Sequence, residues 1–205
     1  TGGRGGGFLA TTYWVDITRY AGIDEKYQRS RQVLGIIQVD NYDDLGRDKL
    51  DEIYADLFGT EAALVRIQFV NGTHAIACAL FGALKSGDVL LSAVGAPYDT
   101  LLGVVGAVDK GPGSLKDYGV EYRQVELLDN KPDLAEMARA AADPRVKAVL
   151  IQRSRGYSTR ASLSAEEIGE MCRVIKKVNS HAAILVDNCY GEFVEAVEPT
   201  HMGAD

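Results

Sequence analysis

The sequence has few of the features that mark membrane-spanning or secreted proteins. It holds three cysteines in 205 residues (Cys78, Cys172 and Cys189) and no CxxC pair. This usage is typical of unpaired thiols in a reducing compartment, so we expect a cytoplasmic location. No apolar run approaches the roughly 18 residues that a membrane-spanning helix needs. No charged and then apolar signal segment opens the chain.

An excess of basic residues is also missing. The net charge is −7 and the lysines and arginines are scattered, which argues against a nucleic-acid surface or an anionic membrane surface as partner. A hydrophobic share of 46% and a charged share of 25% are those of an ordinary globular protein. The length allows one large domain, or one domain and part of another. Because the first residue is Thr, we expect a processed N-terminus or a fragment.

Strands and helices are predicted to alternate from residue 48 onward. Apolar runs typical of buried strands cover residues 62–70, 88–94, 120–127, 146–151 and 183–186. Helical spacing covers residues 48–58, 73–84, 100–108, 133–142 and the stretch after a capping box of Ser164 and Glu167. This order predicts an α/β fold, with a mostly parallel sheet and helices on both faces. Earlier in the chain we expect a disordered glycine-rich start (residues 1–7) and a short helix within residues 23–34.

In such sheets, ligands bind beyond the carboxyl ends of the strands. That rule selects four loops, residues 71–74, 95–100, 152–160 and 187–190. Beyond the first predicted helix, every chemically unusual cluster of residues lies in one of them.

The first of these loops has the features of an anion site. Gly72 follows a predicted strand, and Thr73 and His74 open a helix whose free amides and dipole suit a phosphate group. The alternative is a plain helix N-cap turn. A Walker loop is excluded because no Gly-Lys-Ser/Thr follows.

Two further residues suit a flat heterocyclic cofactor. Tyr98 could stack on its ring, or could simply be a packed turn aromatic. Asp187, at the end of the last predicted strand, could hold a pyridine nitrogen protonated. Its alternatives are a helix cap or a metal ligand, but the three histidines show no ligand spacing. A phosphate cradle, a stacking aromatic and a pyridine-facing Asp in this order are the layout of fold-type I enzymes that use pyridoxal 5′-phosphate (PLP).

Two charged clusters remain. Arg153 and Arg155 suit a substrate carboxylate or a phosphate, although one could equally be a structural ion-pair partner. Residues 41–47 mix charges with Tyr42 ahead of the first clear helix, and the alternative there is a solvated turn.

At the level of motifs the chain resembles the aluminium-resistance protein family, which is methionine gamma-lyase-like and cystathionine beta-lyase-related. The matching blocks run in the family's order over residues 40–205, whereas residues 1–39 form an N-terminal segment without assignment. The blocks are YDDLGRD (42–48), GTHAIA (72–77), PYDTL (97–101), GSL (113–115), QRSRGYS (152–158), VDNCYGEF (186–193) and EPT-x-x-GAD (198–205).

The resemblance implies a PLP-binding large domain with a seven-stranded, mostly parallel sheet, a smaller C-terminal domain, and a homo-oligomer with sites at subunit interfaces. It assigns the PLP phosphate to Gly72, Thr73 and His74, ring stacking and proton transfer to Tyr98, and the pyridinium nitrogen to Asp187, supported by Asn188. It also implies that Tyr42 and Arg47 reach a neighbouring subunit's phosphate. Two departures are Asn71, where the family has Ser, and residues 40–41, where Asp-Asn replaces Gly-Tyr.

The implied activity is PLP-dependent carbon–sulfur lysis of sulfur amino acids, by β- or γ-elimination to a thiol, a keto acid and ammonia. The resemblance places the lysine that holds PLP covalently a couple of dozen residues after Asp187, and none of the nine lysines follows that residue. We therefore expect a fragment of an enzyme, inactive alone. The alternative is a catalytically inactive remnant of the fold or an assembly module.

Overall fold

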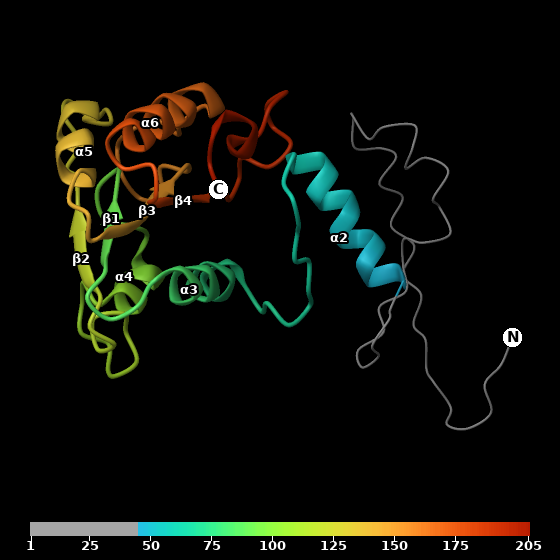
Figure 1. Ribbon diagram of the computed structural model, residues 1–205, viewed down its shortest axis with the longest axis horizontal. Helices are drawn as coiled ribbons and strands as arrows, with labels where there is room; N and C mark the ends of the chain where they lie inside the picture. Colours follow the sequence, from blue (N-terminus) through green and yellow to red (C-terminus); the bar gives the residue numbers. More distant parts are fainter. Residues whose placement is uncertain (1–44) are drawn as a thin grey trace, which may run out of the picture. The chain divides into compact units, whose positions relative to one another are not determined.

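The computed structural model describes residues 45–205, which fall into two compact units divided between Ile67 and Gln68 (Figure 1). The glycine-rich start and the helix predicted within residues 23–34 lie outside the described residues. No helix within the described range is both long and apolar enough to cross a bilayer.

The first unit contains helix α2 (Leu45–Phe58), which confirms the helix predicted for residues 48–58. Its Ile53 side chain is buried. Asp51 fixes the segment that follows the helix, because its carboxylate accepts a hydrogen bond from the Arg66 guanidinium at 2.6 Å.

The strand predicted for residues 62–70 is not formed, so that prediction was wrong. Leu64, Ile67 and Val70 are 62%, 57% and 77% exposed. A strand is stable only when a neighbour satisfies its backbone hydrogen bonds. Among the described residues no segment pairs with this one, so its apolar composition alone does not produce a strand.

The second unit is built on a four-stranded parallel sheet with the strand order β2-β1-β3-β4, which confirms the predicted α/β class. The strands are β1 (Val89–Ser92), β2 (Glu121–Gln124), β3 (Val146–Gln152) and β4 (Ala183–Asp187). The helices are α3 (Gly72–Ala83), α4 (Asp99–Val105), α5 (Leu134–Ala141), α6 (Ala165–Val178) and the 3₁₀ turn η2 (Pro199–Met202).

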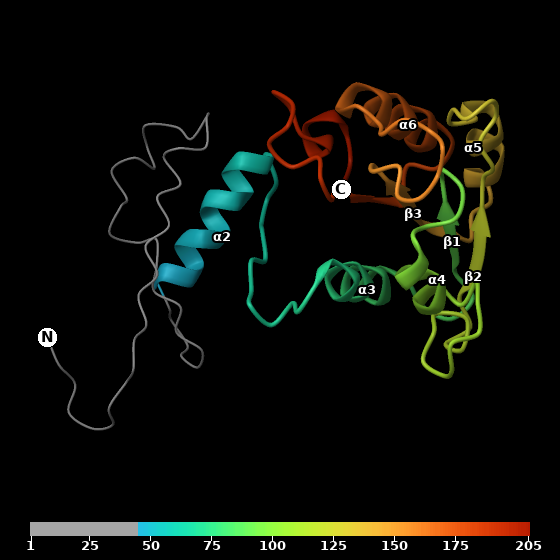
Figure 2. The same ribbon diagram turned by 180° about the vertical axis from the view of Figure 1, so that it is seen from behind.

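Helices cover both faces of this sheet, with α5 and α6 on one side and α3 and α4 on the other (Figures 1 and 2). Alternate residues of a strand point to opposite faces. One buried cluster joins strand residues such as Leu91 and Ile151 to α5 and α6. The other joins Leu90 and Leu150 to α3 and α4. Both faces of the central strands are therefore largely apolar, as their mostly hydrophobic sequence predicts.

Helix α4 is shorter than the predicted range of 100–108, because Gly106 ends it. Gly106 has a φ of 79°, in the left-handed region that favours glycine. A Cβ atom there would lie 2.4 Å from the Lys116 Cβ, so the loop after the helix also packs too closely for a side chain.

The predicted capping box begins α6. The Ser164 hydroxyl accepts the Glu167 amide at 3.1 Å, and the Glu167 carboxylate accepts the Ser164 amide at 2.8 Å. Ser164→Ala is expected to lower the free energy of unfolding by about 1 kcal/mol, because the Glu167 amide loses its acceptor. Urea denaturation measures this, with the exposed Ser180→Ala as the matched control. Equal midpoints for the two variants would contradict a stabilising cap.

Candidate functional site

The carboxyl ends of β3 and β4 meet at one edge of the sheet, as parallel strands require. Asp187, the last residue of β4, lies opposite Gln152, the last residue of β3. The Arg153 amide donates to the Asp187 carbonyl at 3.0 Å and extends the pairing by one residue. The loops that carry the two predicted charged clusters, 152–160 and 187–190, therefore begin side by side.

The turn at the start of α3 holds the predicted phosphate residues. Asn71 is the N-cap, and its side-chain oxygen accepts the His74 amide at 2.8 Å. Asn71 therefore caps the helix, as the serine expected from the resemblance would do. The His74 ring is turned back along the chain, since its Nδ1 accepts the Val70 amide at 3.4 Å.

Two amides of this turn remain for an anion. The first amides of a helix have no partner within the helix, and among the described residues those of Gly72 and Thr73 have no other acceptor. Gly72 is exposed, and beyond its chain neighbours and its own helix backbone no atom lies within 4 Å of the position that a Cβ would take there, so space is open beside this turn. The donor set and the helix dipole fit a phosphate.

Three hydroxyl groups join this turn to the loop after β1. Thr73 Oγ1 lies 2.5 Å from the Tyr98 hydroxyl and 2.6 Å from Thr100 Oγ1. The Tyr98 amide donates to Gln152 Oε1 at 2.8 Å. Because Gln152 is also the neighbour of Asp187 across the sheet, a continuous series of contacts connects the α3 turn with the end of β4.

Asp187 is a buried carboxylate, 8% exposed. In the part of the chain that the structure describes, its one hydrogen-bond donor is the Cys189 amide, 3.2 Å from Oδ1. Burial raises the pKa of the Asp187 carboxyl, and this single hydrogen bond offsets the rise only in part. A buried anion with so few partners fits a cationic ring nitrogen. The described residues contain no cluster of three or more metal-ligating side chains, so this part of the chain gives no support for the metal-ligand alternative.

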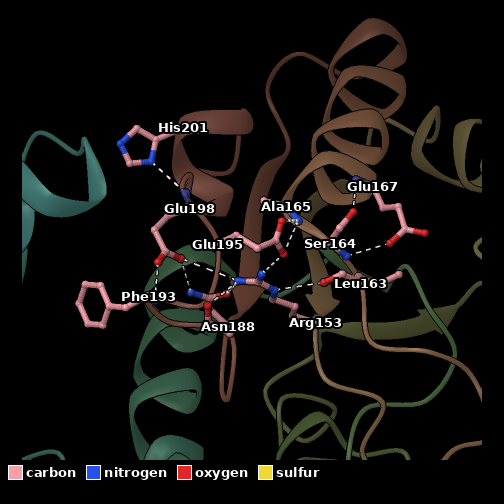
Figure 3. Close-up of polar contacts among 11 residues, drawn as sticks. Arg153, Leu163, Ser164, Ala165, Glu167, Asn188, Phe193, Glu195, Glu198 and His201 are labelled. Carbon is pink, nitrogen blue, oxygen red and sulfur yellow. Dashed lines mark hydrogen bonds and ion pairs between the residues drawn. The ribbon is translucent and has the colours of Figure 1, made fainter. Parts of the chain in front are cut away.

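The two candidate arginines lie in different environments. Arg153 is 4% exposed and ion-pairs with Glu195 and, at 3.8 Å, with Glu198 (Figure 3). These contacts agree with the alternative stated from the sequence, in which one of the two arginines is a structural ion-pair partner. Arg155 is exposed on the same loop.

Asn188 belongs to the ion-pair group around Arg153. Its side-chain oxygen accepts an Arg153 Nη1 hydrogen bond at 2.7 Å, and its Nδ2 donates to Glu198 at 2.9 Å. Although Asn188 follows Asp187 in the chain, its side-chain amide binds Arg153 and Glu198 (Figure 3).

Sequence reasoning missed two residues that shape this edge. Gln152 could have been found, because a polar residue ends an otherwise apolar strand. Arg160 carries no such signal, because it follows an exposed loop. It is nevertheless 3% exposed, and burial lowers the pKa of its guanidinium. All four of its hydrogen bonds go to backbone carbonyls of its own loop and of the β3 end.

The remaining predicted pair is Tyr42 and Arg47. Tyr42 lies outside the described residues, and Arg47 lies in the first turn of α2, in the first unit. Their role toward a neighbouring subunit stays a prediction.

Several known proteins are similar in sequence to this chain. The methionine gamma-lyase family model matches residues 26–205. The chain is 53% identical over 166 residues to an uncharacterized protein, YnbB, of Bacillus subtilis, a match that covers 80% of this chain and 39% of that protein.

Solved structures give the same result. A carbon–sulfur lyase involved in aluminium resistance from Clostridium novyi is 43% identical, with a TM-score of 0.81, over 87% of this chain and 44% of that one. A pyridoxal-5′-phosphate-dependent protein of Escherichia coli, YhfS, is 22% identical, with a TM-score of 0.57, over 77% of this chain and 38% of that one, and it supports the fold alone. The chain thus spans about two fifths of the length of these relatives. This chain belongs to the methionine gamma-lyase family.

Proposed function

We propose that this chain forms the cofactor-binding part of a PLP-dependent carbon–sulfur lyase of sulfur amino acids. The family and the carbon–sulfur lyase of C. novyi support the reaction class. The observation that carries the proposal is the series of contacts from buried Asp187 through Gln152 and Tyr98 to Thr73. This series connects a carboxylate, an aromatic ring and the start of α3, which we propose as the phosphate site, along one edge of the sheet.

These residues fit the three parts of PLP. The open amides of Gly72 and Thr73 would hold the phosphate, with His74 closing the turn. The Tyr98 ring would stack on the pyridine, held by the hydrogen bond that its backbone amide donates to Gln152 Oε1. Asp187 would face the ring nitrogen, which offers the positive partner that this buried carboxylate lacks.

When bound, PLP supplies an electron sink for the negative charge that develops at the substrate's α-carbon. Asp187 would keep the proton on the ring nitrogen. The Tyr98 hydroxyl, which shares a hydrogen bond with Thr73, would give or take a proton at the substrate. The products of a β- or γ-elimination would be a thiol, a keto acid and ammonia.

Substrate recognition falls to Arg155 in this proposal. It is exposed, whereas the Arg153 guanidinium is buried among protein acceptors. A guanidinium can hold the carboxylate of an amino acid with two parallel hydrogen bonds. Tyr42 and Arg47 would complete the phosphate site of a neighbouring subunit in a homo-oligomer.

A second function is favoured by one observation: among the described residues, no lysine hydrogen-bonds or ion-pairs with the contact series of Thr73, Tyr98, Gln152 and Asp187. Of the lysines near the end of the chain, Lys176 donates to the Ala182 carbonyl and ion-pairs with Asp205. In this second function, the chain binds PLP without turning over substrate, or serves in assembly.

Amine rescue separates the two functions. The chain is incubated with PLP and L-cystathionine or L-methionine, with and without methylamine as a substitute for a lysine amine, and keto acid is measured. We expect keto-acid release above the rate of free PLP only with methylamine, because the described residues would hold the cofactor but bring no lysine to it. PLP binding without release in either condition would favour the non-catalytic function.

A further inference from the structure

The guanidinium of Arg153 is almost fully committed to other parts of the chain. Its Nε donates to the Leu163 carbonyl at 3.1 Å, and its Nη1 donates to Asn188 Oδ1 at 2.7 Å and to the Gly191 carbonyl at 2.9 Å. Its Nη2 donates to Glu195. These four bonds use four of the five N–H groups of an arginine, so no fork remains for a substrate carboxylate.

The two residues bound by Nη1 bracket the turn that fixes Asp187. Asn188 and Gly191 lie on either side of Cys189, whose amide is the donor to the Asp187 carboxylate. The Gly191 amide also closes this turn by donating to the Asn188 carbonyl at 2.7 Å. An arginine that holds both sides of a turn thereby limits how the carboxylate before it can rotate.

Gly191 shows how closely Arg153 packs against this turn. A Cβ atom on Gly191 would lie 2.4 Å from Arg153 Nη1 and 2.5 Å from its Cδ. Such contacts are far shorter than packed atoms tolerate. The guanidinium and the glycine therefore occupy positions that depend on each other.

Two glutamates also contact the arginine, Glu195 through Nη2 and Glu198 through Nη1 (Figure 3). Glu195 pairs with Arg153 and also accepts the Ala165 amide at the start of α6, at 3.2 Å. Glu198, 4% exposed, accepts the Asn188 side chain and the Phe193 amide. Residues 188–198 are thus arranged around a single buried cation.

We propose that Arg153 is a positioning residue, which fixes the turn after β4 so that Asp187 faces the cofactor's ring nitrogen. The inference rests on the proposed function, because it names what holds the carboxylate of the same site. It assigns Arg153 a role through Asp187 and leaves substrate contact to Arg155.

The test uses the 205-residue chain and pyridoxamine 5′-phosphate, which carries the ring nitrogen and the phosphate but cannot form a covalent link with a lysine. The dissociation constant and the pKa of the bound probe's ring nitrogen are read from its fluorescence across a pH series. The variants are Arg153→Met, Arg153→Lys and Gly191→Ala, with Asp187→Asn as reference. Arg139→Met is the control, because that side chain is 78% exposed and pairs with Glu136 on α5.

We expect Arg153→Met to weaken binding about tenfold, as loss of a group that orients a ligand does elsewhere. The ring-nitrogen pKa should fall toward the value in Asp187→Asn, and Arg153→Lys should restore part of both, because lysine keeps the charge but not the fork. Gly191→Ala should act in the same direction by displacing the guanidinium. If circular dichroism shows that Arg153→Met does not fold, Gly191→Ala serves as the test variant in its place.

The experiment distinguishes failure of the proposed function from failure of the inference about Arg153. Equal probe binding by wild type and Asp187→Asn would overturn the proposed function, and the inference with it. A normal Asp187 effect, together with unchanged affinity and ring pKa in the folded Arg153 and Gly191 variants, would overturn the inference alone. A lower melting temperature without a change in ring pKa would make Arg153 a purely structural residue and would also overturn it.

Discussion

Asp187→Asn is expected to weaken binding of pyridoxamine 5′-phosphate by roughly 10- to 100-fold, the cost of a hydrogen bond to a charged group. The substitution keeps the size of the side chain and an acceptor for the Cys189 amide, so it removes only the charge. The ring nitrogen of the bound probe should lose its proton at a lower pH, because no anion stabilises the pyridinium. Fluorescence titration measures both effects.

The same substitution is expected to raise the stability of the unliganded chain at neutral pH. Burial raises the pKa of Asp187 above the value of about 3.9 that an unfolded aspartate has. Between these two pKa values the folded chain keeps a proton that the unfolded chain releases, so wild-type stability falls as the pH rises through that window. Asparagine carries no titratable proton and escapes this loss. The gain should therefore be present at neutral pH and absent below the window.

Thermal unfolding at several pH values measures this gain, with Glu170→Gln as the control, because that carboxylate is exposed on α6. An increase in melting temperature together with weaker probe binding would identify Asp187 as a residue kept for its site at a cost in stability. Unchanged probe affinity in Asp187→Asn would contradict its assignment to the ring nitrogen.

The parts of the fold that the sequence predicts correctly are those decided by local pattern. β3 and β4 are mostly apolar runs, and the Ser164–Glu167 box places the start of α6 at the right residue. Residues 62–70 have the same apolar composition and form no strand. The difference lies in the hydrogen-bond partner, which a single apolar run cannot reveal.

The candidate site also contains residues whose positions the sequence predicts and residues whose surroundings it does not. Thr73, Tyr98 and Asp187 stand at element ends that the pattern locates, and contacts in the structure connect them. The surroundings of Arg153 could not be predicted, because its partners Asn188 and Glu195 lie 35 and 42 residues further along the chain. Burial of a charge is decided by such distant partners and not by neighbouring residues.

Arg160→Met is expected to lower the free energy of unfolding by about 3 kcal/mol, the upper end of the cost of leaving buried polar groups unsatisfied. The guanidinium donates to the carbonyls of Gln152 at 2.7 Å, Ser154 at 2.6 Å and Ala161 at 2.9 Å, and methionine replaces its aliphatic part but none of these bonds. Urea denaturation measures the loss, with Arg173→Met as the control, because that arginine is exposed on α6.

The effect should reach the site, because the carbonyl of Gln152 is held by Arg160 while its side chain holds the Tyr98 amide. Hydrogen exchange of the Tyr98 amide should therefore accelerate in Arg160→Met and not in Arg173→Met. If both variants unfold at the same urea concentration, the four carbonyls find water without cost, and the 152–161 loop does not depend on its buried cation.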